Sequence, residues 1–269
     1  MSPVSADSAG SRPVALVTGG AHRLGGEIVL HLAANGWDVA VHYNRSARAA
    51  AEVCDRAQAL GAKACALPAD LEDDSAVQTL VPQAAVALGR VDAVVNNASL
   101  FEYDDAQHFD TLQAQRHYRV NTIAPVLLAQ ALHAHLLVRH AAGCVVNLLD
   151  QKLSNPDPDY LSYTLSKAAL QAATTTLAQA LGPVLRVVGV APGLMLPSGP
   201  MTGDEFSRVH GRTPLQRGCT PLDVAQAVRF LLDASAITGA TLLVDGGQHL
   251  IGHGRDVLFV ARNQNPGAA

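Results

Sequence analysis

Seven short apolar runs alternate with longer helical patterns along most of this chain, and no other feature constrains the fold as strongly. The runs occupy residues 14–17, 38–42, 64–68, 93–96, 144–149, 186–191 and 241–244. Helical patterns lie between them, for example over residues 26–35, 47–60, 74–88 and 112–139. Continuous apolar strands separated by helices predict a parallel sheet buried on both faces. We therefore expect an α/β fold with a central, mostly parallel seven-stranded sheet flanked by helices on both faces.

The 269 residues are enough for one large α/β domain, and we expect that domain over residues 13–252. Residues 1–12 are small and polar without an apolar centre, which predicts a flexible N-terminal tail and not a signal peptide. Residues 193–220 are rich in Pro and Gly, and a long irregular segment of this kind is typical of a lid. Residues 253–269 show no clear pattern and are expected to form a C-terminal tail.

Charge and cysteine usage exclude several classes of protein. The net charge of −4 is mild and no basic run occurs, so we expect no nucleic-acid partner. No apolar stretch is expected to be long enough to span a membrane. The four cysteines, at positions 54, 65, 144 and 219, show no C-x-x-C pairing, which predicts reduced thiols in a cytoplasmic protein. The histidines at 133, 135 and 140 do not converge on one face of a helix, so we expect no metal site.

A glycine turn follows the first strand and opens the first helix, with the sequence Thr18-Gly19-x-x-x-Arg23-Leu24-Gly25. Gly19 permits a backbone conformation that most side chains disfavour, and Gly25 permits close packing of the helix. Amide groups at the start of that helix can then bind a pyrophosphate. A purely structural turn would have the same two glycines, so the motif needs support from elsewhere in the chain.

The end of the second strand provides that support. An NAD-specific enzyme usually has an acidic residue there to hold the ribose hydroxyls, whereas this chain has Tyr43, Asn44, Arg45 and Ser46. Arg45 can pair with a 2′-phosphate and Ser46 can donate a hydrogen bond to it. This predicts NADPH or NADP⁺ as the cofactor. Alternatively, Arg45 is a solvated residue at the start of a helix.

Tyr163 and Lys167 lie one helical turn apart, thirteen residues after Asp150 at the end of the fifth strand. Residues four apart share a helix face, so we expect the ammonium to lower the pKa of the phenol and to suit it for proton transfer near neutral pH. Ligands in open parallel sheets bind at the carboxyl ends of the strands, where these motifs all lie. The alternative for Tyr163 is a packed helix residue with its hydroxyl at the surface.

Together these motifs resemble the short-chain dehydrogenase/reductase family over nearly the whole chain. That resemblance implies a single-domain Rossmann-type fold. Most of the family has a serine where Asp150 stands, and an aspartate there, together with Arg23 and the Arg45-Ser46 segment, is similar to the pteridine reductase branch. The resemblance implies that Arg23 reaches both the phosphates and the pterin, and that Phe101 stacks on the pterin. Alternatively, Phe101 is packed in the core.

The resemblance also implies roles for residues at the other strand ends. Asp70 and Leu71 would border the adenine, although an aspartate there can also cap the following helix. Asn121 would hold a water beside Lys167, or would be satisfied within its own helix. The remaining cofactor contacts are expected from the ends of the fourth and sixth strands, namely Asn97, Ala98 and Ser99, then Pro192, Gly193 and Leu194. Ser99 is also expected to contact the substrate.

The carboxyl of Asp150 distinguishes the enzymatic alternatives. A carboxylate repels a developing alkoxide but suits a substrate that presents N–H groups, and burial can raise its pKa enough for it to carry a proton with Tyr163. Alternatively, Asp150 caps a loop while another group, with Ser154 as a candidate, replaces the serine of the family. We predict an NADPH-dependent pterin reductase; the alternatives are a carbonyl or 3-oxoacyl reductase and a non-catalytic NADP(H) sensor. The resemblance further implies a homotetramer built through helices near residues 112–139 and 160–181.

Overall fold

The structure is a computed structural model that describes residues 12–263. Residues 1–11 of the predicted N-terminal tail lie outside the described residues. Arg12, which was assigned to that tail, is anchored to the domain because its guanidinium donates hydrogen bonds to the carbonyls of Ala33 and Gly61.

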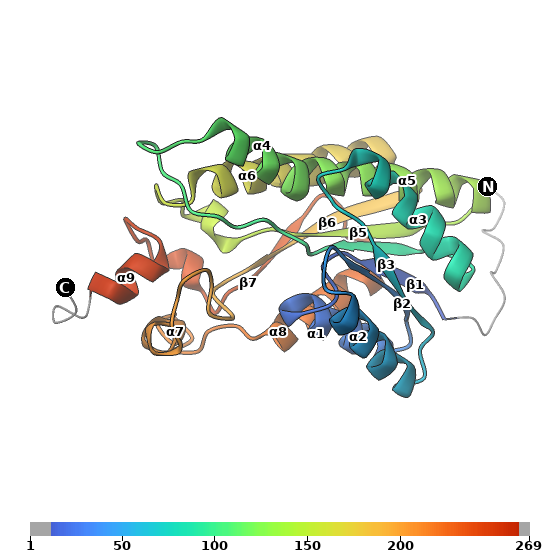
Figure 1. The fold of residues 1–269 in the computed structure, drawn as a ribbon, viewed down its shortest axis with the longest axis horizontal. Helices are drawn as coiled ribbons and strands as arrows, with labels where there is room; N and C mark the ends of the chain where they lie inside the picture. Colours follow the sequence, from blue (N-terminus) through green and yellow to red (C-terminus); the bar gives the residue numbers. More distant parts are fainter. Residues whose placement is uncertain (1–11, 264–269) are drawn as a thin grey trace.

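Seven parallel strands form one sheet in the order β3-β2-β1-β4-β5-β6-β7, which confirms the predicted fold class (Figure 1). The order reverses between β1 and β4, and such a reversal leaves a crevice at the carboxyl ends of the strands. The predicted strand ends shift by at most two residues. The strands are β1 Val14–Val17, β2 Asp38–Tyr43, β3 Ala64–Pro68, β4 Ala93–Asn96, β5 Gly143–Leu148, β6 Leu185–Pro192 and β7 Thr241–Val244.

Helices cover both faces of the sheet, because successive side chains of each strand point to opposite sides. In β1, Ala15 and Val17 pack into one apolar core and Leu16 packs into the other. The first core is covered by α1 Arg23–Ala34, α2 Ala47–Ala59 and α8 Pro221–Asp233. The opposite layer contains α3 Asp74–Leu88, α4 Thr111–Tyr118, α5 Ala124–Arg139 and α6 Leu161–Leu181.

The helix predicted over residues 112–139 is interrupted by a π-helical turn, Arg119–Ile123, that contains Asn121. The continuous stretch Thr111–Arg139 is long and apolar enough to cross a membrane by length and composition alone, so the expectation that no stretch has this length is wrong. Within α5, however, Leu128, Leu132 and Leu136 are fully buried against the sheet, as in the core helix of a globular domain.

The segments beyond β6 and β7 build the remaining wall of the molecule. Residues 193–220, the predicted lid, contain one short helix, α7 Gly203–His210, which begins at a capping box formed by Thr202 and Glu205. The predicted C-terminal tail is in fact partly helical, with α9 Val257–Asn263 packed against α7. Residues 264–269 of that tail lie outside the described residues. The domain boundary predicted at residue 252 therefore excludes a segment that packs against the domain.

Candidate active site

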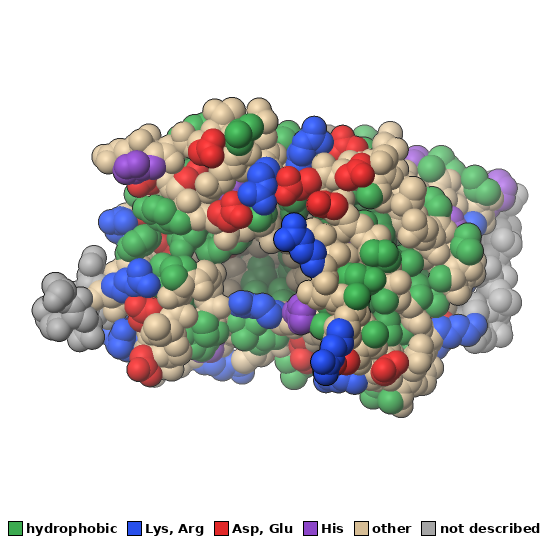
Figure 2. All heavy atoms as spheres, in the orientation of Figure 1, with side chains coloured by type: hydrophobic (Ala, Val, Ile, Leu, Met, Phe, Trp, Pro, Cys, Tyr) green, Lys and Arg blue, Asp and Glu red, His purple; other side chains and the backbone are tan. Residues whose placement is uncertain are grey.

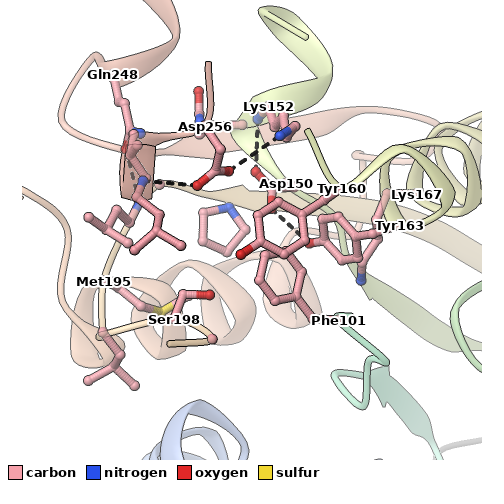
Figure 3. Close-up of a pocket in the computed structure, with 18 of the residues that line it drawn as sticks. Phe101, Asp150, Lys152, Tyr160, Tyr163, Lys167, Met195, Ser198, Gln248 and Asp256 are labelled. Atoms are coloured by element: carbon pink, nitrogen blue, oxygen red, sulfur yellow. Dashed lines mark hydrogen bonds and ion pairs between the residues drawn. The ribbon is translucent and has the colours of Figure 1, made fainter. Parts of the chain in front are cut away.

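A cavity of about 510 Å³ lies at the carboxyl ends of the central strands. Figure 2 shows the molecular surface hollowed between the two helical layers, with Lys and Arg side chains at the rim. Six parts of the chain line it: the glycine turn, the segment after β4, the segment after β5, the start of α6, the lid, and residues 251–258. The predicted catalytic residues Asp150, Tyr163 and Lys167 all belong to this lining (Figure 3).

The glycine turn requires both of the glycines that the sequence analysis selected. Gly19 has a φ of +62°, in the left-handed region. A Cβ atom on Gly25 would lie 2.1 Å from the carbonyl oxygen of Gly19. Asn97 secures the same turn, because its Nδ2 donates to the carbonyl of Thr18 at 2.9 Å. The start of α1 is thereby held open toward the cavity, as a pyrophosphate site requires.

His42, which the sequence analysis did not select, fixes this turn to the neighbouring strands. Its Nδ1 accepts a hydrogen bond from the amide of Gly19 at 3.1 Å, and its Nε2 lies 3.2 Å from the carbonyl of Ala69. Nε2 must therefore carry the proton and donate it. Burial lowers the pKa of His42 and keeps the ring neutral, which this pattern needs. The position of His42 on a predicted strand did not indicate that its ring would bond to the glycine turn.

Arg23 has a φ of +50° at the start of α1. This is the left-handed conformation, which favours glycine over residues with a side chain. The guanidinium lines the cavity and donates to the carbonyl of Pro197 in the lid at 2.6 Å. Arg23 therefore lies between the glycine turn and the lid, and its predicted contacts with the phosphates and the substrate stay predictions.

The end of β2 has the properties expected of a phosphate site. Arg45 is exposed, and among residues 12–263 no hydrogen bond or ion pair is formed by its guanidinium. Ser46 is the residue that precedes α2, and its hydroxyl does not cap that helix. A free cation and a free hydroxyl beside a helix N-terminus suit a 2′-phosphate. Tyr43 and Asn44 lie at the same end of β2.

Asp70 does not cap α3, which was one of its two predicted roles. The cap of α3 is Asp73, whose carboxylate accepts hydrogen bonds from the amides of Ser75 and Ala76. Asp70 instead accepts from the amide of Glu72 at 3.0 Å through one oxygen. Leu71 is buried against the second apolar core. The other oxygen of Asp70 is left available for the predicted adenine contact, which stays a prediction.

The centre of the site is a hydrogen bond between the buried phenol of Tyr163 and the partly buried carboxyl of Asp150. The hydroxyl of Tyr163 donates to Oδ2 of Asp150 at 2.7 Å (Figure 3). The other oxygen of Asp150 accepts from the amide of Lys152 at 2.8 Å and caps a short 3₁₀ helix, Gln151–Ser154. Asp150 therefore caps a loop and also contacts the phenol of Tyr163, and its catalytic role stays a prediction. Ser154 is exposed and does not belong to the cavity lining, so it cannot supply the hydroxyl of the family's serine.

The pKa of Tyr163 shifts in the direction opposite to the predicted one. Burial, followed by the adjacent Asp150 carboxylate, raises the pKa of Tyr163 well above 10. Burial likewise raises the pKa of Asp150 above its usual range. The Nζ atom of Lys167 lies 5.8 Å from the centroid of the Tyr163 ring and donates to the carbonyl of Leu148 at 2.7 Å, and burial lowers its pKa to about 8. Tyr163 is therefore held as a proton donor.

Asn121 is buried in the π-helical turn and connects the loop after β4 to α6. Its Oδ1 accepts from the amide of Leu100 at 2.8 Å and from the hydroxyl of Ser99 at 3.2 Å. Its Nδ2 donates to the carbonyl of Leu100 and to the hydroxyl of Ser166. The side chain therefore has its hydrogen-bonding positions occupied by protein. The predicted water beside Lys167 stays a prediction, and it would have to be held by backbone groups.

Phe101 lies in the site and not in the apolar core. Its ring stacks on Tyr160 with centroids 4.2 Å apart and contacts Tyr163 edge-on at 4.7 Å. Tyr160, which the sequence analysis did not select, has a φ of +54° just before α6. Its ring is buried, and burial raises its pKa to about 12. An aromatic platform thus stands beside the proton donor.

The nicotinamide end predicted at Pro192, Gly193 and Leu194 is closed by β7 and the turn after it. A Cβ atom on Gly193 would lie 2.7 Å from Oε1 of Gln248, so only glycine fits between β6 and that turn. The same oxygen accepts a hydrogen bond from the amide of Leu194 at 2.9 Å. The three residues line the cavity as predicted.

Two further buried residues outside the predicted set position the site. Asp104 accepts hydrogen bonds from the amide and the hydroxyl of Ser162, directly before Tyr163. Nε2 of His117 accepts from the amide of Glu102 at 3.2 Å and holds the loop that carries Phe101. Neither residue belongs to a recognisable sequence pattern, because both act between segments that are far apart in the chain.

Comparisons with known proteins agree with this geometry. A family model described as enoyl-(acyl carrier protein) reductase matches residues 19–249. A ketoacyl reductase 2 of the granaticin polyketide synthase of Streptomyces violaceoruber is 35% identical over 91% of this chain and 100% of its own. Pteridine reductase 1 of Leishmania tarentolae is 32% identical over 88% and 96%. The crystal structure of FolM alternative dihydrofolate reductase 1 from Brucella canis, complexed with NADP, is 41% identical with a TM-score of 0.83, covering 89% and 95%.

Proposed function

The chain belongs to the short-chain dehydrogenase/reductase family, and from that premise we propose that it is an NADPH-dependent reductase of pterins. The observation that carries the proposal is the 2.7 Å hydrogen bond between Tyr163 and the partly buried carboxyl of Asp150. The platform formed by Phe101 beside this pair supports it. The Leishmania pteridine reductase and the Brucella dihydrofolate reductase among the similar proteins support the same substrate class.

The cofactor site fits NADPH on features of the structure itself. Gly25 packs directly on the backbone of Gly19, since a Cβ there would lie 2.1 Å from the Gly19 carbonyl oxygen, and this tight turn leads into the start of α1, where backbone amides can bind a pyrophosphate. The free guanidinium of Arg45 and the hydroxyl of Ser46 suit a 2′-phosphate. Lys167 has one protein partner, so two of its N–H groups can bind the nicotinamide ribose. When bound, NADPH supplies a hydride.

The chain's own residues supply the rest of the reaction. Reduction of a ring C=N bond adds a hydride to carbon and a proton to nitrogen. Tyr163 gives its phenolic proton, because its raised pKa keeps that proton in place until the ring nitrogen becomes basic. Asp150, whose pKa is raised by burial, can return a proton to Tyr163 when protonated and can accept a hydrogen bond from a pterin N–H when ionised.

A carbonyl or 3-oxoacyl reductase is the second candidate, favoured by the similarity to the granaticin ketoacyl reductase. The site argues against it, because Asp150 would repel an alkoxide and Ser154 lies outside the cavity. A non-catalytic sensor is a third candidate, but sensing would not need the Tyr163–Asp150 pair.

Steady-state assays with NADPH against dihydrobiopterin, dihydrofolate and an acetoacetyl thioester separate the three candidate functions. Turnover of the thioester alone, or of no substrate, would reject the proposal.

We also propose a homotetramer. The support is the family resemblance, together with apolar side chains on α4, α5 and α6 that are exposed in the single chain, including Leu112, Val138 and Leu165. Mass photometry measures the assembly directly. A monomer at micromolar concentration would reject this proposal without affecting the proposed activity.

A further inference from the structure

One wall of the cavity is built by residues from the C-terminal segment. Arg255 and Asp256 precede α9, and both line the cavity together with Val257 and Leu258. In Figure 3, Asp256 lies near Lys152 on the same side of the cavity as Asp150. The segment therefore contacts the site even though it is the last part of the described chain.

An ion pair with ideal geometry ties this segment to the start of α6. Nε and Nη2 of Arg255 donate to the two carboxylate oxygens of Asp159, each at 2.8 Å. The amide of Asp256 donates to the same carboxylate at 2.8 Å. The Asp159 side chain is 3% exposed and that of Arg255 is 47% exposed. Although burial opposes ionisation, these bonds hold the pKa of Asp159 below its usual range.

A second ionic link runs between the same two segments. Nζ of Lys152 lies 2.6 Å from Oδ1 of Asp157 and 3.3 Å from Oδ2 of Asp256. All three side chains are largely buried. Lys152 also donates its amide to Asp150. The C-terminal segment is thus joined to the loop between β5 and α6 at two points, through Lys152 and through Asp159, which directly precedes Tyr160.

Tyr160 connects these links to the reacting groups. It directly follows Asp159, and its left-handed backbone, with φ +54° and ψ +52°, is costly for a bulky residue. Such a conformation persists only where the surrounding structure imposes it. Its ring stacks on Phe101, which in turn contacts Tyr163. Arg255, Asp159, Tyr160 and Phe101 therefore form one chain of direct contacts and peptide linkage.

We infer that Arg255 and Asp159 are positioning residues that hold the Tyr160–Phe101 platform in place for the substrate. The inference rests on the proposed function insofar as the platform binds a pterin. It assigns to the C-terminal segment a role in substrate affinity and none in hydride or proton transfer. Loss of the pair should loosen the platform while leaving Tyr163, Asp150 and the cofactor site intact.

The test compares Arg255→Ala and Asp159→Asn with Arg262→Ala. Arg262 makes a similar ion pair from α9, to Glu205 of α7 at 2.9 Å, but has no contact with Asp159. Steady-state kinetics with dihydrobiopterin should show KM raised about tenfold in the first two variants, with kcat within about threefold of wild type. The NADPH Kd should be unchanged, and Arg262→Ala should leave KM unchanged. A variant that only reduced the folded fraction would lower the apparent kcat and not raise KM.

The double variant and hydrogen exchange complete the test. Because the two residues act as one unit, the double variant should have the KM of the more affected single variant; additive effects would contradict the inference. Amide exchange should rise over residues 159–163 in the Arg255 variant and only within α9 in Arg262→Ala. If Arg255→Ala does not fold, the KM and amide exchange of the nearly isosteric Asp159→Asn variant test the inference instead. Should the wild type reduce no pterin, the proposed function fails, and unchanged exchange over residues 159–163 would separately reject the positioning role.

Discussion

The hydrogen bond between Tyr163 and Asp150 places two groups that can both carry a proton against one aromatic platform. Burial favours the protonated form of each, since it raises both pKa values. A hydroxyl in place of Asp150 could donate to a carbonyl oxygen but could neither accept a pterin N–H as strongly nor return a proton as readily. The chemistry of the site therefore depends on the identity of this one residue.

Replacing Tyr163 by Phe removes the proton donor without changing the cavity's shape. We expect reductase turnover to fall by about two to four orders of magnitude, while the NADPH Kd measured by fluorescence titration stays the same. Tyr103→Phe is the matched control, because it removes an exposed phenol that is bonded to Asp105. Nearly full turnover in Tyr163→Phe would show that another group donates the proton.

Lys167 should set the alkaline limit of activity. Burial lowers its pKa from 10.5 to about 8, so the ammonium is present below that pH and is lost as the pH rises through it. The pKa of Tyr163 is well above 10, so the phenol does not titrate in this window. We expect kcat/KM for NADPH, which reports the free enzyme, to decline above about pH 8. A profile that stays level to pH 10 would contradict this assignment.

Residue identities in the site could be predicted where a local motif specified them. Asp150, Tyr163, Lys167 and the turn glycines were found by spacing and by their place at strand ends. The pKa of Tyr163 was predicted in the wrong direction, because the spacing to Lys167 is visible in the sequence but burial and the approach of Asp150 are not. Asp104 and His117 were missed because each acts across a long sequence separation.

At the scale of elements, two adjacent glycines at the start of α1, Gly25 and Gly26, should respond differently to substitution by alanine. Gly25→Ala would place Cβ 2.1 Å from a backbone oxygen, so the turn must shift. We expect a loss of about 1–3 kcal/mol of unfolding free energy and of most NADPH affinity. In Gly26→Ala the new Cβ would lie 3.8 Å from the carbonyl oxygen of Gly20, an ordinary contact, and the change should be neutral or stabilising by up to about 1 kcal/mol. Thermal melting and NADPH titration of both variants test this contrast.

The junction of β2 and α2 should determine the choice between the two nicotinamide cofactors. A charge-assisted arginine–phosphate contact is worth about 1.5–3 kcal/mol, so Arg45→Ala should reduce the preference for NADPH over NADH by roughly ten- to a hundredfold. Arg48→Ala is the control, since Arg48 lies in the first turn of α2, close to Arg45 in the sequence, and pairs with Glu52. Equal kcat/KM for the two cofactors in the wild type would refute the role of Arg45.

Strands and long helices could be predicted because their apolar patterns are themselves the cause of burial. The interruption at Arg119–Ile123 could not, since a π-helical turn depends on the tertiary contacts of Asn121 with Leu100 and Ser166. Helix α9 has seven residues, too few to be stable alone, and it forms where it packs on α7. Its sequence therefore carries no strong helical signal.

On the scale of the whole molecule, the sheet order brings segments from the full length of the chain to one edge. The reversal between β1 and β4 opens the crevice, and the lid and the C-terminal segment close its far side. This arrangement follows from parallel topology, which the sequence predicted. The sequence did not predict that the C-terminal segment lines the cavity. Ion pairs such as Arg255–Asp159, which hold the segment there, join residues about a hundred positions apart.

Asp150→Ser, assayed beside the wild type with NADPH against dihydrobiopterin and an acetoacetyl thioester, tests the central claim most directly. We expect the wild type to reduce the pterin, and the variant to lose more than about 2 kcal/mol of transition-state stabilisation, or at least about thirtyfold in kcat/KM, with NADPH affinity nearly unchanged. The contradictory result is a wild type without pterin activity and a variant with improved reduction of the thioester, which would make the protein a carbonyl or 3-oxoacyl reductase.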